Sequence, residues 1–112
     1  MRTFDVITIG SATRDVFLRS RGIKIIRDGS FSTGQAECFA LGSKIDVDEI
    51  VFETGGGGTN TAVGFARQGL RTAFVGKISA TDVHGQEILE ALRADKVDTS
   101  LVIKDRRRGT GY

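Results

Sequence analysis

Residues 53–69 read ETGGGGTNTAVGFARQG, which places four consecutive glycines directly before a polar Thr-Asn pair and a run with helical periodicity. Glycine has no Cβ, so it is favoured where the chain turns tightly or where another group approaches the backbone. Ala62, Val63 and Ala66 share one face of the expected helix, and Gly69 is typical of a helix C-terminal cap. The stretch therefore predicts a glycine-rich turn that leads into a helix.

Apolar runs on either side of this stretch predict strands that alternate with helices. They are a strand at 4–9 that stops at Gly10, a strand at 72–76, a helix at 86–95 and a strand at 101–103. Strand, helix, strand, helix, strand in this order indicates right-handed crossovers between parallel strands. The fold class expected is therefore α/β, with a doubly wound, mainly parallel sheet.

The block between the first strand and the glycines has a different pattern. Ile23–Arg27 alternates as a half-exposed strand and is followed by the turn Asp28-Gly29-Ser30. Residues 31–37 carry no clear pattern, and residues 39–53 indicate one or two further half-exposed strands. We expect residues 20–54 to project from the main sheet as a small sheet of their own.

Composition bounds the class of protein. The chain has 112 residues, 39% hydrophobic and 27% charged, with a formal net charge of +2 and one cysteine, Cys38. This length suits about one small domain, and no apolar run approaches the ~18 residues that a membrane span needs. The charge is too small to indicate a nucleic-acid partner. With no leader pattern and no cysteine pair, we expect a cytoplasmic protein without a membrane partner.

The residues leave several explanations of the glycine run open. A phosphate-binding P-loop needs Gly-Lys-Ser/Thr, whereas Thr59 and Asn60 follow the glycines, and a dinucleotide fingerprint should come directly after the first strand. A tight structural turn requires glycine without any ligand. A neutral, hydroxyl-rich ligand is also compatible, because backbone N–H groups at a helix N-terminus and the Asn60 amide offer donors and an acceptor to sugar hydroxyls.

Segments in the same order along nearly the whole chain resemble the PfkB family of carbohydrate kinases, which have a ribokinase-like fold. The glycine run with Asn60 and Gly69, followed by Phe74–Ile78, is similar to the family's N-terminal signature. Residues 9–15 look like its first strand and substrate-binding turn, and residues 82–85 resemble the acidic step that opens its next helix. The resemblance makes residues 1–112 the N-terminal part of such a kinase domain.

The resemblance implies ATP-dependent phosphorylation of a hydroxyl on a sugar or nucleoside. The residues that match the family's substrate-binding positions are Asp15, Gly56, Gly57 and Asn60, with Thr13 standing where the family commonly has Asn. ATP and Mg²⁺ are implied as cofactors. Residues 20–54 and 109–112 would be strands of the family's lid, and a homodimer formed through that lid is a further expectation.

One element of the family pattern has no counterpart in residues 1–112. The family's catalytic base is an Asp in an Asp-Thr-x-Gly-Ala-Gly-Asp stretch, and nothing in this chain resembles it. We therefore expect the chain to be the sugar-binding half of a kinase, with no catalytic residue of its own, truncated and inactive alone. The alternative is a non-catalytic binding or dimerisation module that uses the lid sheet as its partner surface.

Overall fold

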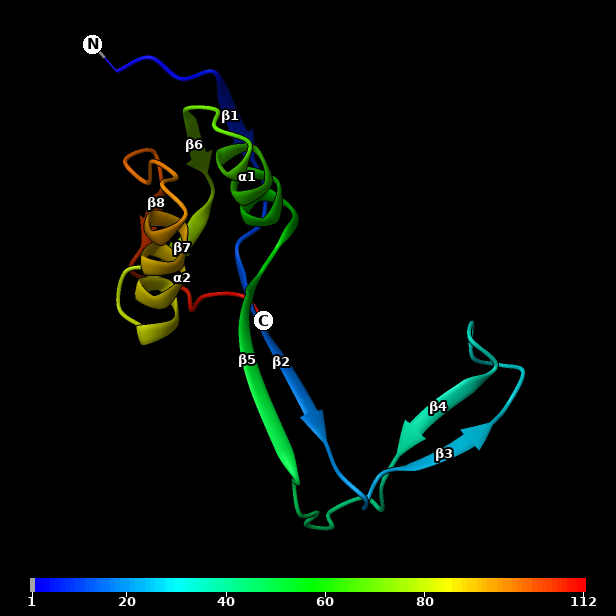
Figure 1. Cartoon of the computed structure of the whole chain (residues 1–112). Helices are drawn as coiled ribbons and strands as arrows, with labels where there is room; N and C mark the ends of the chain where they lie inside the picture. Colours follow the sequence, from blue (N-terminus) through cyan, green and yellow to red (C-terminus); the bar gives the residue numbers. More distant parts are fainter. Residues whose placement is uncertain (1) are drawn as a thin grey trace. The chain divides into compact units, whose positions relative to one another are not determined.

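The computed structural model describes residues 2–112, which divide into two compact units (Figure 1). The core unit contains residues 2–15 together with Phe52–Tyr112, and the insertion unit is Val16–Val51. Neither helix in the described part of the chain combines the length and the apolar character needed to cross a lipid bilayer.

Parallel strand pairs form the framework of the core unit. Strand β1 (Val6–Ile9) pairs with β6 (Thr72–Val75), and β7 (Lys77–Ser79) pairs with β8 (Ile103–Asp105), both in parallel. Only Gly76 separates β6 from β7. The predicted parallel arrangement is therefore confirmed for these strands.

The core unit contains the two helices that the hydrophobic periodicity predicts. Helix α1 (Gly57–Arg67) begins inside the glycine run, and Gly69 beyond its end has a φ of 88°, the left-handed geometry expected of a glycine cap. Helix α2 (Val83–Ala94) begins after Asp82, whose side chain accepts a hydrogen bond from the Gly85 N–H.

Both helices cover the same side of the parallel strands. Ala62 of α1 and Leu92 of α2 belong to one buried cluster with Phe74 of β6, and each of these three side chains is fully inaccessible. Alternate residues of a strand point to opposite faces. Thr8 faces α1, donating its hydroxyl to the Gly58 carbonyl, whereas the neighbouring Ile9 is 79% exposed. The helices expected on both faces of a doubly wound sheet are therefore not found within residues 2–112.

The third core strand lies later in the chain than the hydrophobic run suggests. The strand predicted at 101–103 is wrong by two residues, since β8 begins at Ile103 and Leu101 is 41% exposed. The chain instead reaches β6 earlier, where Asp98 forms an isolated parallel bridge with Ala73. Backbone hydrogen bonding to β6, rather than apolar content, decides where this segment joins the sheet.

The insertion unit contains a hairpin. Strand β3 (Lys24–Arg27) pairs antiparallel with β4 (Gln35–Cys38), so the predicted strand at 23–27 and the turn after it are confirmed. Residues 31–37 carry no clear sequence pattern, so β4 was not predicted; its residues alternate between exposed and half-buried, and none is fully buried. Of the one or two strands predicted over residues 39–53, one is found at Glu49–Gly55, and residues 39–48 lie outside the strands.

Two longer strands run across the boundary between the units. Strand β2 (Thr13–Arg19) and β5 (Glu49–Gly55) form a two-stranded sheet. The sequence indicated a turn at residues 10–15 and no strand over 16–19, so β2 was not predicted. Large apolar side chains of the insertion unit remain exposed, including Phe17 at 59%, Ile25 at 64% and Phe39 at 57%.

Asp82 links the start of α2 to the end of the chain. Its carboxylate accepts hydrogen bonds from the Thr110 N–H at 2.7 Å, the Thr110 hydroxyl at 2.8 Å and the Gly85 N–H at 2.8 Å. The Thr110 N–H is the largest cause that lowers the pKa of Asp82 to about 2. Because this pKa lies below its ordinary value, the carboxylate stabilises the fold above about pH 4, and the stabilisation is lost as the pH falls toward 2.

Asp82→Ala is therefore expected to lower the free energy of unfolding by about 1–2 kcal/mol near neutral pH, as loss of a helix cap does. Urea unfolding at about pH 7 and about pH 2.5 tests the linkage. The deficit should shrink at the lower pH, where the wild-type carboxylate is partly protonated. Glu90→Ala, on the exposed face of α2, is the matched control. An equal deficit at both pH values would contradict the assignment.

Candidate functional site

The glycine run and the turn after β1 meet at the carboxyl end of that strand. Ser11 accepts hydrogen bonds from three N–H groups of α1: its hydroxyl from Gly57 at 3.0 Å, and its carbonyl from Gly58 at 3.2 Å and Thr59 at 3.3 Å. The expectation that these N–H groups are open to a sugar is therefore wrong for the structure as it stands. Ser11 caps α1 from 46 residues away, a role that sequence reasoning missed.

Two of the four glycines are closed by the chain's own backbone and core. Gly56 has a φ of 105°, and a Cβ there would lie 2.5 Å from the Ser11 carbonyl oxygen. A Cβ on Gly58 would lie 2.7 Å from the Phe74 ring and 2.8 Å from the Gly10 carbonyl carbon. Internal packing is thus sufficient to require glycine at both positions.

The other two glycines differ from each other. The Asp15 carboxylate occupies the space that a side chain on Gly55 would need, whereas a Cβ on Gly57 would meet nothing within 4 Å among the described residues. Gly57 also has an ordinary helical backbone and is exposed. Of the four glycines, Gly57 is therefore the one with open space beside its Cα, while its N–H is bonded to the Ser11 hydroxyl.

Thr13 and Asp15 stand together beside the glycine run. The Thr13 hydroxyl donates to Asp15 Oδ1 at 3.1 Å, and the same carboxylate lies against Gly55. Both side chains are only half-buried. The structure thus brings together two of the predicted site residues from β2 and places them next to the start of α1.

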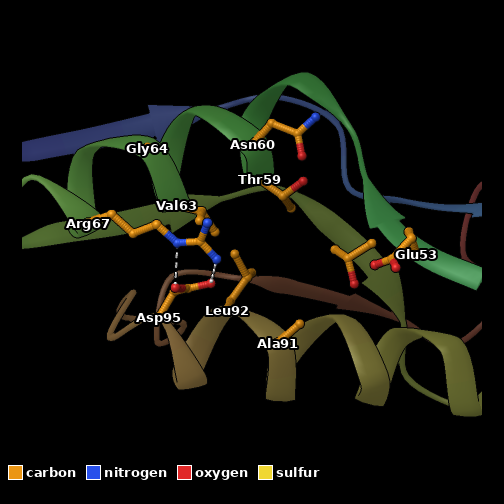
Figure 2. Close-up of a pocket in the computed structure, with 10 residues that line it drawn as sticks. Glu53, Thr59, Asn60, Val63, Gly64, Arg67, Ala91, Leu92 and Asp95 are labelled. Carbon is orange, nitrogen blue, oxygen red and sulfur yellow. Dashed lines mark hydrogen bonds and ion pairs between the residues drawn. The ribbon is translucent and has the colours of Figure 1, made fainter.

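Asn60 faces a different space. Its side chain is exposed and lines a cavity of about 460 Å³ between α1 and α2 (Figure 2). Val63 and Leu92 also line this cavity, and the Arg67–Asp95 ion pair, with a shortest distance of 2.8 Å, lies at its far side. Asp15, Gly56 and Gly57 are not among the lining residues. The structure therefore does not join Asn60 to the other predicted site residues in one cavity.

A charged cluster on the opposite face of β2 escaped the sequence analysis. Arg14 lies with its guanidinium carbon 4.3 Å from the centre of the Phe52 ring and forms an ion pair with Glu87 of α2. His84 and Tyr112 pack edge to face with ring centres 5.4 Å apart. In a strand, Arg14 points to the face opposite Thr13 and Asp15, which would have indicated this cluster. That inference requires knowing that residues 13–15 form a strand.

Parallel strands paired side by side, with helices packed on them and a glycine-rich helix start, define an α/β protein. The comparisons with known proteins place it more narrowly. The profile of the pfkB family carbohydrate kinases matches residues 5–112, and the chain belongs to that family.

Two relatives of similar sequence are named as kinases. A 5-dehydro-2-deoxygluconokinase from Listeria monocytogenes serotype 4a (strain HCC23) is 30% identical over 104 residues, which are 93% of this chain and 26% of the relative. A protein of the same name from Geobacillus thermodenitrificans (strain NG80-2) is 42% identical over 52 residues, 46% of this chain and 15% of the relative. The chain therefore spans about a quarter or less of the length of these relatives.

Solved structures agree on the fold. A PfkB protein from Polaromonas sp. JS666 superposes with a TM-score of 0.65 and 28% identity, covering 96% of this chain and 29% of that one. Arabidopsis thaliana ribokinase, solved with ribose and ATP, superposes with a TM-score of 0.74 and 24% identity over 97% of this chain and 30% of that one. The fold is the α/β fold of the ribokinase-like kinases.

Proposed function

We propose that the complete protein transfers a phosphoryl group from ATP to a hydroxyl of a sugar or nucleoside, and that this chain supplies the sugar-binding half. Family membership and the kinase names of its relatives support the reaction class. The observation that carries the binding role is the Thr13–Asp15 pair, held against Gly55 beside the start of α1.

The geometry suits the recognition of hydroxyl groups. Thr13 engages one carboxylate oxygen of Asp15, and the half-buried carboxylate retains acceptor capacity for sugar hydroxyls. Hydrogen bonds to an ionised acceptor are stronger than neutral ones. Gly57 leaves the adjacent backbone open, so a sugar ring can approach it without meeting a side chain. In this proposal Gly56 shapes the turn, and Asn60, whose side chain lines the separate cavity between α1 and α2, is given no direct sugar contact.

The described residues offer no metal site. They contain no group of three or more His, Cys, Asp or Glu side chains close enough to hold a metal ion. Residues 1–112 also lack the Asp-Thr-x-Gly-Ala-Gly-Asp stretch of the family, so we assign the catalytic base and the metal nucleotide to no residue of this chain. Phosphoryl transfer requires a positioned base and a bound metal nucleotide together, so the 112-residue chain alone is proposed to be inactive.

The test is an ATP-coupled screen of the complete protein encoded by the reading frame that contains these residues. Ribose, fructose, adenosine and sugar acids of the gluconate type are the acceptors, and the 112-residue chain is assayed beside the complete protein. We expect turnover of at least one acceptor by the complete protein and none by the short chain. Turnover by the short chain would contradict its assignment as a binding half.

The exposed apolar side chains of the insertion unit favour one second candidate, a binding or dimerisation module. Phe17, Phe39 and Glu37 line a groove of about 430 Å³ within this unit. Apolar grooves of this kind mark contact surfaces between proteins. The same screen separates the candidates, because a complete protein that self-associates in sedimentation experiments and turns over no acceptor would support the module.

A further inference from the structure

Arg14 is held by three other segments of the core unit. Its guanidinium stacks on the Phe52 ring of β5 at 4.3 Å, and its Nη1 pairs with Glu87 of α2. Its backbone N–H donates to the Gly111 carbonyl at 2.9 Å. Because neighbouring residues of a strand point to opposite faces, the two side-chain contacts of Arg14 hold β2 from the side opposite Asp15.

The partner of Arg14 is itself part of a larger network. His84 Nδ1 lies 3.5 Å from Glu87 Oε2, and the His84 ring packs edge to face on Tyr112. Arg14, Phe52, His84 and Glu87 all line one cavity of about 240 Å³. The orientation of the Arg14 side chain therefore depends on α2 and on the end of the chain as well as on β5.

This network is poorly suited to a purely stabilising role. The Arg14 side chain is 15% exposed, and its Nε, like His84 Nδ1, is buried without a hydrogen-bond partner among the described residues. The Glu87 side chain is 45% exposed, so water weakens its attraction for Arg14, and the unpaired buried N–H of Arg14 adds a cost in free energy. This cost in stability is expected where the position of β2 matters for function.

We propose that Arg14 is a positioning residue for the sugar-binding carboxylate. Clamped between Phe52 and Glu87, Arg14 fixes the backbone of β2 and so holds Asp15 against Gly55 and beside Thr13. This inference rests on the proposed function, because it assumes that Asp15 receives the sugar. Arg14 itself lies on the far face of the strand and is not assigned a contact with substrate.

The test is steady-state kinetics of the complete protein with the acceptor found in the screen. Arg14→Ala is expected to raise the KM for the sugar about 10- to 100-fold, the scale of a misplaced binding group, and to leave the KM for ATP unchanged. Arg14→Lys should recover part of the loss, because it keeps a charge opposite Glu87 but cannot stack as a planar group on Phe52.

Two controls separate positioning from stability. Arg71→Ala removes an ion pair with Asp5 of 2.7 Å beside the amino ends of β1 and β6, and it should leave both KM values unchanged. In an Asp15→Asn background, Arg14→Ala should add little to the sugar KM, because both substitutions disable the same contact. Additive effects of the two substitutions would overturn the inference.

The outcomes also distinguish this inference from the function on which it rests. Normal sugar turnover with an unchanged sugar KM in Arg14→Ala overturns the positioning role alone. Absence of turnover by the wild-type complete protein overturns the proposed function and the positioning role with it. If Arg14→Ala unfolds, Arg14→Lys becomes the deciding variant, and a wild-type sugar KM in a folded Arg14→Lys with a shifted unfolding midpoint would assign Arg14 to stability.

Discussion

Asp15→Asn in the complete protein is expected to lower kcat/KM for the sugar roughly 100- to 1000-fold. The substitution is nearly isosteric, so the side chain still fits against Gly55 and can still accept from Thr13. It removes the negative charge and replaces one acceptor oxygen by a donor. Asp15 is proposed to accept two charge-assisted hydrogen bonds from sugar hydroxyls, and the substitution weakens both. Their combined loss is about 3–4 kcal/mol, which corresponds to the stated decrease in kcat/KM.

Steady-state kinetics against sugar and ATP, with urea unfolding of the same samples, measure this effect. Asp46→Asn is the matched control: it makes the same charge change in the insertion unit, at a side chain for which no described hydrogen bond or ion pair is found. It should keep wild-type kinetics. A wild-type kcat/KM for Asp15→Asn would remove Asp15 from the sugar site, whereas a loss matched by unfolding would make its role structural.

Neighbouring glycines are expected to respond in opposite ways to the same added methyl group. Gly58→Ala should lower the free energy of unfolding by about 3 kcal/mol, because its Cβ has no room against the Phe74 ring and the Gly10 backbone. Gly57→Ala should leave stability unchanged or raise it by up to about 1 kcal/mol, since its position is open and alanine favours helix.

Sugar binding, unlike stability, should respond to the substitution at Gly57. If the sugar lies over Gly57, Gly57→Ala should raise the KM for the sugar at least about 10-fold in a fully folded protein. Gly64→Ala is the matched control, because it makes the same change at an exposed glycine further along α1, where an added Cβ also meets nothing within 4 Å. Wild-type sugar kinetics in Gly57→Ala would show that the open side of this glycine does not face the substrate.

Local patterns predicted elements that bury side chains in the core. Strands β1 and β6 coincide with short apolar runs that end at a glycine. Helices α1 and α2 coincide with periodic apolar faces, and Gly69 caps the end of α1 while Asp82 caps the start of α2. Strands β2 and β4 were missed because their side chains are mostly exposed or half-buried, so no alternation of apolar and polar residues marks them.

Part of the candidate site could be predicted because its residues lie in short motifs. The segment from Gly55 to Asn60 and the turn that contains Thr13 and Asp15 carry the family resemblance, and the family is confirmed by the match over residues 5–112. The contact of Asp15 with Gly55 joins residues 40 positions apart, and Arg14 reaches Glu87 across a still longer separation. No local pattern contains such pairs.

The amino-acid sequence alone therefore established the α/β class, the family and the residues that deserve testing as a sugar site, because hydrophobic periodicity and short motifs are local properties of the chain. Only the tertiary structure determined why glycine is required, or not required, at each position of the run. Ser11 and Phe74 close Gly56 and Gly58, Asp15 closes Gly55, and Gly57 stays open. The close approach of distant segments determines those differences, and four identical letters in a row cannot encode them.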